Sequence, residues 1–445
     1  MKICVEKVVA GGLGLGRRED GCTVLVPAVL PGELVRVKVR RSHRSYQEAT
    51  LVELLEPSPE RRLPPCPWYD RCGGCDLQHA SYPCQLELKQ QILRELLQRH
   101  GLAAQVEPVL APPLASEQEL NYRQRIRLQV AAGRLGFFQA GSHRFTEVEQ
   151  CLLARPAINR VWRQLSASSP WRRLAEQGEA LEFSLDPQSG RVVLLLHHRR
   201  RPRPAEREAA WQLCRELAEL KGIAFLPLGH QAGPFIDRQS GAQGRDGTEQ
   251  LRLHFLLPAA LAGRSLDLTA EPTAFCQVNE GQNQRLLARL FALLQPEGDE
   301  VLADLHCGMG NFSLPLALRC GRVYGVDIQA AAIRGAKHNA LANGIENCRF
   351  SRAGAREGLA ALHAAAIHPD ILLLDPPRGG CLELVRFVGS PLPNRIVMIS
   401  CDPATMVRDL AVLGQKGYRV ASMQLIDMFP QTHHLETITL LRHHG

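Results

Sequence analysis

The stretch VLADLHCGMGNF, residues 301–312, decides the fold that this sequence predicts. Its first part, Val301–Leu305, is apolar apart from Asp304 and predicts a buried strand. Gly308 and Gly310 follow, and a helical stretch comes after them. Glycines at this place let the backbone approach a ligand at the N-terminus of a helix. The stretch therefore predicts the ligand-binding strand, turn and helix of an α/β domain.

The same succession of strand, turn and helix repeats toward the C-terminus. We expect further apolar strands at Val323–Asp327, Ile371–Asp375 and Ile396–Ser400, with helical stretches between them. This alternation predicts a doubly wound parallel sheet. Ligands of such sheets bind at the carboxyl ends of the strands, so polar residues at those ends are candidate site residues.

The class of ligand follows from the glycine turn and the end of the next strand. Asp327 closes that strand, where an acidic side chain accepts hydrogen bonds from ribose hydroxyls. A dinucleotide-binding turn has the form Gly-x-Gly-x-x-Gly, whereas Asp304-x-x-Cys-Gly-x-Gly is the form seen in S-adenosylmethionine enzymes. We favour this methyl donor over a dinucleotide, and a purely structural tight turn is the remaining alternative.

Length and charge indicate several domains and a polyanionic partner. At 445 residues the chain predicts about three domains, and 45% hydrophobic with 22% charged residues excludes a mainly disordered, collagen-like or coiled-coil protein. The net charge is +8, and residues 1–50 carry nine Lys or Arg against five Asp or Glu. This excess makes the N-terminal segment a candidate nucleic-acid contact.

The expected domains are residues 1–60, 61–270 and 271–445. In residues 1–56, short β-type runs alternate with glycine turns and predict a small β-barrel, and the proline-rich residues 57–67 follow as a linker. The sequence of the second domain predicts a mixed α/β fold. In the barrel, a basic cluster ends one strand and either meets phosphates or forms a solvated strand edge: Lys38, Arg40, Arg41 and Arg44.

Four cysteines have the spacing of a metal site. Cys66, Cys72 and Cys75 are close in sequence, and Cys151 follows at a distance. Zinc ribbons use two Cys-x2-Cys pairs, so a single distant cysteine favours an iron–sulfur cluster over zinc, with unligated core thiols as the third reading. Cys84 is the neighbouring thiol most easily mistaken for a ligand. The Cys-x3-Cys-x2-Cys triplet of radical enzymes is absent, which favours a structural or RNA-positioning cluster.

Cys401 and Glu436 are the candidate catalytic pair. Cys401 follows a buried strand and precedes a helix near Ala404, and a helix N-terminus lowers the pKa of a thiol. A cysteine suits methylation at carbon 5 of a pyrimidine, since its thiolate adds at carbon 6 and activates carbon 5. Glu436 would then remove the carbon-5 proton. The alternatives are an inert buried thiol, a surface carboxylate, and Cys307 or Cys381 as the nucleophile.

The loop Asp375-Pro-Pro-Arg378 ends a later strand of the same domain. Enzymes that methylate amino groups end similar loops with an aromatic residue that stacks on the target base. Arg378 in that place argues against amino-group methylation.

These motifs, in this order, resemble the RNA uracil-5 methyltransferases over nearly the whole chain. The resemblance implies an N-terminal barrel of the TRAM or OB-like type, a central domain with a cysteine-ligated cluster and a C-terminal Rossmann-like class I methyltransferase domain. It rests on the following segments: Asn121–Arg123, Phe275–Asn279, Asp304–Phe312, Asp375–Arg378, Ser400–Asp409 and His434–Leu441.

The resemblance also assigns roles to single residues. It implies Cys401 as nucleophile and Glu436 as base. Contacts with S-adenosylmethionine or the target base are implied for Gln277, His306, Asn311, Asp327 and Asp375, and ligation of a 4Fe-4S cluster for Cys66, Cys72, Cys75 and Cys151. Three positions depart from the family pattern: His306 replaces an aromatic residue, Gly354 a polar one, and Asp402 an asparagine. The carboxylate of Asp402 would raise the pKa of the Cys401 thiol.

The implied function is methylation of a uridine in 23S ribosomal RNA. Transfer RNA is the alternative substrate, and a catalytically silent RNA-binding assembly factor is the alternative of another class. No apolar segment suits a signal peptide or a membrane span, so we expect a cytoplasmic protein without a membrane partner, acting as a monomer.

Overall fold

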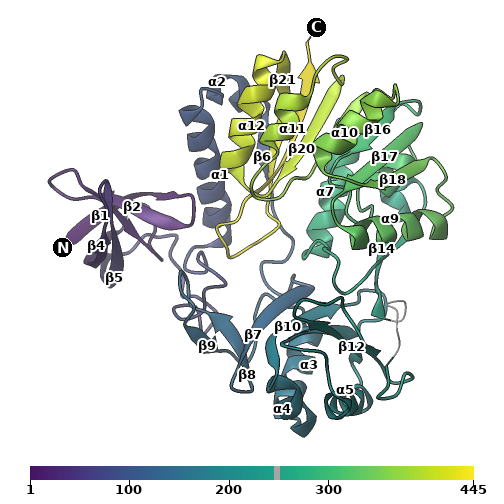
Figure 1. Cartoon of the computed structure of the whole chain (residues 1–445). Helices are drawn as coiled ribbons and strands as arrows, with labels where there is room; N and C mark the ends of the chain where they lie inside the picture. The colour runs from purple at the N-terminus through teal and green to yellow at the C-terminus, as the bar shows by residue number, and fades with distance from the viewer. Residues whose placement is uncertain (245–250, 445) are drawn as a thin grey trace.

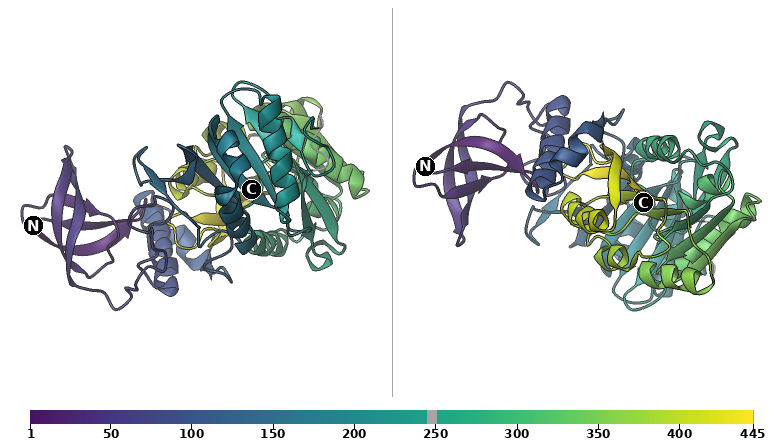
Figure 2. Two further views of the ribbon diagram at one scale, coloured as in Figure 1. Left: turned by 90° about the horizontal axis from the view of Figure 1, so that it is seen from below. Right: turned by 90° about the horizontal axis from the view of Figure 1, so that it is seen from above.

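A small barrel at one end of the molecule is followed by two larger α/β bodies in the computed structural model (Figures 1 and 2). The structure describes residues 1–244 and 251–444. Residues 245–250 of the expected central domain and residue 445 of the C-terminal domain therefore lie outside the described residues. The boundaries expected at residues 60 and 270 stay a prediction.

The N-terminal barrel is closed and has five strands in the order β1-β2-β3-β5-β4. Apolar side chains that alternate along the strands fill it, among them Ile3, Val5 and Val24. The small barrel expected from sequence is therefore confirmed. Its strands are β1 Lys2–Val9, β2 Leu13–Arg17, β3 Thr23–Val26, β4 Leu34–Ser42 and β5 Tyr46–Glu56.

Helix α1, Tyr82–Arg99, links the barrel to the C-terminal body (Figure 1). It begins at Tyr82 because the Ser81 side chain accepts a hydrogen bond from the backbone of Cys84 and Pro83 suits the first turn. Its apolar face packs on Val8 and Leu30 of the barrel segment and on strands of the C-terminal sheet. The short helices α2 Ala103–Val106 and η1 Glu107–Val109 follow.

The central body is a seven-stranded mixed sheet in the order β13-β12-β11-β10-β7-β8-β9, covered by helices α3, α4 and α5 (Figure 1). Only β11 and β12 pair in parallel among these strands. The expected mixed α/β fold is confirmed here. The elements are β7 Arg125–Ala131, β8 Arg134–Phe138, β9 Phe145–Glu147, α3 Pro156–Ala167, α4 Ser169–Ala175, β10 Gly178–Leu185, β11 Val192–His198, α5 Pro204–Glu216, β12 Leu220–Pro227 and β13 Phe235–Ile236.

The C-terminal body is an eight-stranded sheet in the order β18-β17-β16-β19-β20-β22-β21-β6. Residues of β19 alternate between two cores: Ile371 and Leu373 face one, Leu372 and Leu374 the other. Burial on both faces explains the continuous apolar run of this strand. The strands are β16 Val301–Asp304, β17 Arg322–Asp327, β18 Cys348–Arg352, β19 Ile371–Leu374, β20 Arg395–Ser400, β21 Tyr418–Ile426, β22 Glu436–His443 and β6 Leu110–Leu114.

The sheet departs from the expected all-parallel arrangement at one side. Strands β18 to β20 are parallel, but β22 lies antiparallel between β20 and β21. Strand β6 pairs with β21 although it lies far upstream in the sequence. It contains Pro112 and Pro113, which only an edge strand accommodates. The covering helices are α7 Glu280–Leu294, α8 Ser313–Ala317, α9 Ala330–Ala342, α10 Ala355–Ala364, α11 Leu382–Phe387 and α12 Pro403–Gln415.

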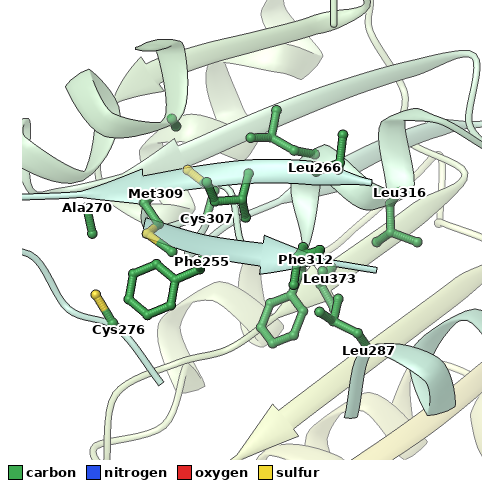
Figure 3. Packing of buried hydrophobic residues seen from close by; sticks show 14 of the residues in the cluster. Phe255, Leu266, Ala270, Cys276, Leu287, Cys307, Met309, Phe312, Leu316 and Leu373 are labelled. Carbon is green, nitrogen blue, oxygen red and sulfur yellow. The ribbon is translucent and has the colours of Figure 1, made fainter. Parts of the chain in front are cut away.

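A hairpin precedes this sheet and completes its core. It consists of β14 Leu253–Leu257, α6 Ala259–Ala262 and β15 Leu266–Ala270. Figure 3 shows Phe255, Leu266 and Ala270 of the hairpin gathered with Met309 and Phe312, which follow β16. The turn that decides the fold is thereby packed against the hairpin. Among the described residues, no helix is both long enough and apolar enough to cross a membrane.

Candidate active site

A cavity of about 650 Å³ opens at the carboxyl ends of the parallel strands. The loops after β16, β17, β19 and β20 and the start of β22 line it, as the strand-end argument requires. Six of the seven residues expected at the donor and catalytic site line this cavity: Gln277, His306, Asp327, Asp375, Cys401 and Glu436.

Asn311 is the expected residue that the structure places elsewhere. It lines a small neighbouring cavity and exchanges two hydrogen bonds of 2.9 Å with the side-chain amide of Asn283 on α7. Gln277 lines both cavities. The sequence placed Asn311 correctly in the turn after β16 but did not determine which way its side chain points.

The turn after β16 is fixed to the end of β17. The backbone N–H of Gly308 donates to Asp327 Oδ2 at 3.1 Å, and Gly308 has a φ of 55°. Gly310 has a φ of 92°, and a Cβ there would lie 2.8 Å from Leu314 Cδ1. Both turn glycines are therefore required by backbone conformation, and Gly310 also by space.

Asp304 lies fully buried beneath this turn. Its Oδ2 accepts a hydrogen bond of 2.6 Å from the Ser313 hydroxyl. Burial raises the pKa of Asp304 to about 7, despite this hydrogen bond. The carboxyl thus serves the turn as an internal hydrogen-bonding group and is removed from contact with solvent.

Cys401 directly follows β20 and precedes α12. Burial raises the pKa of its thiol to about 11, the carboxylates of Glu436 and Asp375 add to this, and Arg378 opposes it. The lowering expected from a helix N-terminus is therefore wrong for this thiol. The neighbouring Asp402 caps α12, since its Oδ1 accepts a hydrogen bond of 2.9 Å from the backbone N–H of Thr405.

Of the three carboxyl groups that line the cavity, Glu436 and Asp375 raise the pKa of this thiol. Glu436 is only 5% exposed, and burial, followed by the charge of Asp375, raises its pKa well above the usual value. Desolvation raises the pKa of Asp375 to about 7, with the charge of Asp304 as the second cause. Like charges in a desolvated site oppose one another's ionisation. A carboxylate with a raised pKa binds a proton more tightly than an exposed one, which suits a general base.

The other candidate nucleophiles do not reach the cavity. Cys307 is buried in the core beneath the turn, and Cys381 is buried where α11 meets α12, with its backbone N–H bound to Asp409. Burial raises the pKa of both thiols strongly. Cys401 is therefore the thiol that the structure presents to the cavity.

Further residues line the cavity, although the sequence gave them no role in binding donor or base. Ile328 follows Asp327, Arg378 ends the loop after β19, and Phe429 and His434 come from the segment between β21 and β22. The exposed ring of Phe275 lies at the same cavity. Phe275, Arg378 and His434 lie in segments that carry the family resemblance, and the signal for Phe429 was the run Phe429-Pro-Gln-Thr-His-His434 between two apolar strands.

A second cavity, of about 240 Å³, lies between the linker segment and the central body. All four expected cysteines line it, Cys66, Cys72, Cys75 and Cys151, whereas Cys84 lies on α1 outside it. Its other lining is largely aromatic and apolar, with Arg123 and Arg127 as cations. Within residues 1–244 and 251–444 no three His, Cys, Asp or Glu side chains are grouped closely enough to hold one metal ion.

The four cysteines of this cavity would suit a group held by four thiolates, such as an iron–sulfur cluster. Zinc draws its thiolates to about 2.3 Å from one point, whereas a cluster places several irons between four thiolates. Four cysteines around one cavity supply the number of thiolates that such a cluster takes. Occupancy by a cluster stays a prediction.

The sequence and the fold are similar to those of RNA methyltransferases. The sequence model of the tRNA (Uracil-5-)-methyltransferase family matches residues 248–444. The chain is 35% identical over 445 residues to the 23S rRNA (uracil(1939)-C(5))-methyltransferase RlmD of Chromohalobacter salexigens, with 99% of this chain and 88% of that protein covered. It is also 35% identical to RlmD of Pseudomonas putida, with 99% and 93% covered.

A solved structure shares the whole fold. The Pyrococcus abyssi tRNA (uracil-54, C5)-methyltransferase, in complex with S-adenosyl-L-homocysteine, superposes with a TM-score of 0.74 at 22% identity, covering 99% of both chains. At this identity the likeness establishes a common arrangement of barrel, central body and C-terminal sheet.

Proposed function

Because this chain belongs to the RNA uracil-C5 methyltransferase family, we propose that it methylates carbon 5 of one uridine in 23S ribosomal RNA. It is an S-adenosylmethionine-dependent RNA methyltransferase. The names of its relatives support 23S ribosomal RNA, and the name of the matching family keeps transfer RNA as the second candidate. The observation that carries the chemistry is one cavity that holds a cysteine and a glutamate from two different strand ends.

Cys401 is the proposed nucleophile. Its thiolate adds to carbon 6 of uracil, forming a sulfur–carbon bond and moving the ring electrons into an enolate over carbon 5 and oxygen 4. Carbon 5 then takes the methyl group, and the electron pair of the broken bond stays on the donor sulfur. The target base must leave its stack to reach a thiol inside a cavity, which costs a few kcal/mol.

Glu436 is the proposed base that completes the reaction. It takes the proton from carbon 5, and the released electron pair restores the carbon 5–carbon 6 double bond and expels the Cys401 thiolate. Its burial supports this role, because a desolvated carboxylate binds a proton more tightly than an exposed one. Once Glu436 has released this proton to solvent, both residues are ready for another turnover.

The remaining cavity residues would bind the methyl donor and the base. Asp327 ends β17 where it can accept hydrogen bonds from the ribose hydroxyls, while Asp375 and Gln277 line the cavity and can bind the base or the donor. His306 would contact the donor through its ring. Asn311 would act through Asn283, by fixing α7 to the turn after β16.

We expect Cys66, Cys72, Cys75 and Cys151 to hold a 4Fe-4S cluster. The four thiols that line one cavity support this, and a bound cluster would join the linker segment to the central body. Anaerobically purified Cys75→Ser should lose its iron and sulfide. Stoichiometric zinc in the unaltered protein would instead favour the zinc alternative.

The barrel would bind RNA in the manner of a TRAM domain. Its exposed basic cluster, Lys38, Arg40, Arg41 and Arg44, supports this assignment. We expect the enzyme to act as a monomer in the cytoplasm.

The deciding experiment incubates anaerobically purified protein and methyl-labelled S-adenosylmethionine with unmodified 23S ribosomal RNA and, separately, unmodified transfer RNA. Labelled 5-methyluridine in the ribosomal RNA alone supports the proposal. Label in transfer RNA alone overturns the substrate, and donor binding without transfer to either RNA favours a silent RNA-binding protein. Cys401→Ala should form no covalent adduct with 5-fluorouridine RNA; an adduct at full activity would overturn the nucleophile.

A further inference from the structure

The segment of residues 427–435, here named the active-site loop, connects β21 to β22. It brings Phe429 and His434 to the cavity and ends directly before Glu436. The centres of the His434 and Phe429 rings lie 5.7 Å apart, and Arg378 Nη2 is 3.5 Å from His434 Nε2. The position of this loop therefore sets the position of three cavity residues.

Gln431 fixes the middle of the active-site loop. It is fully buried and has a φ of 70°, a conformation that non-glycine residues seldom adopt. Its backbone N–H donates to Gln85 Oε1 at 2.9 Å, and its side-chain Oε1 accepts from Gln85 Nε2 and Arg62 Nη2, each at 3.0 Å. Surrounding contacts must hold a residue in such a conformation.

Residues 66–78, here named the cysteine segment, contact the active-site loop directly. The backbone N–H groups of Asp76 and Leu77 both donate to the carbonyl oxygen of Gln431, at 3.2 and 3.1 Å. His433 Nδ1 lies 2.6 Å from Asp76 Oδ2. Asp76 is the residue next to Cys75, so a displacement of Cys75 moves Asp76 as well.

The barrel reaches the same point. Gly12 lies in the turn between β1 and β2, and a Cβ on it would stand 3.0 Å from His433 Cβ and 3.3 Å from Asp76 Oδ1. This position favours glycine because its φ is 76° and because a side chain would crowd His433 and Asp76. Barrel, cysteine segment and active-site loop thus meet at the pair of Asp76 and His433.

A second connection runs on the other side of the loop. Arg123 lines the cysteine cavity, and its guanidinium carbon lies 5.7 Å from the centre of the Phe429 ring. Its neighbour Tyr122 is buried and donates a hydrogen bond of 3.0 Å to the carbonyl oxygen of Pro430. The cysteine cavity is therefore joined to the active-site loop at two places.

We propose that Asp76, Gln431 and His433 are positioning residues that couple the four-cysteine site and the barrel to the active-site loop. A filled cysteine site holds Asp76 in place, and Asp76 holds Gln431 and His433. Phe429, His434 and Glu436 then stand correctly for methyl transfer. The inference rests on the proposed function, since it takes the loop to position the base of that reaction.

Hydrogen exchange of residues 427–435 tests the coupling without RNA. We expect Cys75→Ser to speed exchange there about tenfold, within the roughly 5- to 150-fold range of coupled sites. His433→Ala should speed exchange to a similar degree while the protein keeps its iron. The double variant, Cys75→Ser with His433→Ala, should exchange little faster than either single variant, because both changes break the same connection. His433→Gln keeps a donor for Asp76 and should restore slow exchange.

Turnover gives the second readout. His433→Ala should lower kcat about tenfold while its affinity for S-adenosylmethionine stays unchanged. The matched control is His43→Ala, which breaks a histidine–carboxylate pair of 2.9 Å with Glu48 in the barrel and should leave loop exchange unaltered.

Unchanged loop exchange in both Cys75→Ser and His433→Ala would overturn the coupling, and so would fully additive effects in the double variant. Failure of the proposed function would show itself separately, as an absence of 5-methyluridine from the unaltered enzyme. The exchange measurement keeps its meaning in that case because it needs no turnover.

Discussion

At the residue scale, Cys401 lies in surroundings that oppose its ionisation. Burial and the carboxylates of Glu436 and Asp375 raise its pKa to about 11, and Arg378 is the cation that lowers it. A thiolate is nevertheless the reactive form. Burial, two carboxylates and one guanidinium therefore together govern how much reactive thiolate the site holds.

Arg378→Met should make Cys401 less reactive. Without the guanidinium the thiol pKa rises, so the thiolate fraction falls at every pH below that value. Between about pH 7 and 10, we expect iodoacetamide to alkylate Cys401 about two- to tenfold more slowly in this variant than in the unaltered protein. The rate should rise about tenfold per pH unit in both proteins. Mass spectrometry of the Cys401 peptide measures this rate. Arg386→Met, an exposed change on α11, is the control, and equal rates in all three proteins would contradict the assignment.

Glu436→Gln should trap the reaction after methyl transfer. A glutamine amide cannot take the carbon-5 proton, so the methylated base stays bonded to Cys401. Turnover should fall about 10²- to 10⁴-fold, the usual contribution of a general base, while labelled protein–RNA adduct accumulates. Denaturing electrophoresis detects this adduct. Normal turnover without adduct would exclude Glu436 as the base; Glu383→Gln on the exposed side of α11 is the matched control.

At the element scale, one helix stabilises the loop that completes the site. Lys89 of α1 and Asp427, which directly follows β21, form a fully buried ion pair of 2.6 Å. Lys89 Nζ also donates to the carbonyl oxygen of Phe429, and the Tyr82 hydroxyl donates to Asp427 Oδ2 at 2.9 Å. Because the ion pair is desolvated, α1 and the start of the active-site loop depend on each other.

Lys89→Met should destabilise the protein by about 3–5 kcal/mol, because it leaves the Asp427 carboxylate buried without its cation. Replacing both residues with apolar ones, Lys89→Met with Asp427→Leu, should cost less than the single change. Urea unfolding followed by circular dichroism measures both. Lys7→Met is the control, since Lys7 of β1 also pairs with α1, through Glu95, but this pair is partly exposed and contributes at most about 1 kcal/mol. Equal destabilisation by Lys89→Met and Lys7→Met would contradict this account.

At the scale of the whole molecule, the barrel stands at one end (Figure 2). Its β1–β2 turn reaches the active-site loop at Gly12. Its basic cluster is exposed along the end of β4 and the following turn. In the proposed function the barrel binds RNA at this end of the molecule, and Gly12 lies against the pair proposed to position the loop. RNA binding at the barrel and catalysis at the cavity would then lie at separate places and be connected through Asp76 and His433.

Replacing Lys38, Arg40, Arg41 and Arg44 with alanine should weaken RNA binding chiefly at low salt. Each phosphate that the variant no longer neutralises reduces the slope of log affinity against log salt by about 0.7–0.9, so the slope should fall by about 3 if all four side chains contribute. Filter binding at several potassium chloride concentrations measures it. S-adenosylmethionine affinity of the same variant is the internal control, and an unchanged slope would assign RNA binding to another surface.

Much of the site could be predicted because it lies at strand ends. Strand β16 and Gly308, Gly310, Asp327, Asp375 and Cys401 all follow from apolar runs that stop at polar residues. The placement of Phe429 and His434 at the cavity could not be predicted in this way, since no periodic pattern marks the loop that carries them. The direction of Asn311 depends on Asn283 of another helix, and the pKa of Cys401 on carboxylates from two other strand ends.

The sequence by itself determined the small barrel, the strand–turn–helix order, the donor turn and the four cysteines, because these depend on residues near one another in the chain. Only the tertiary structure decided that β6 joins the C-terminal sheet, that Lys89 pairs with Asp427, and that Asp76 meets His433 beside Gly12. The two side-chain pairs join residues 338 and 357 positions apart. Desolvation and packing fix them, and both arise only when the whole chain has folded.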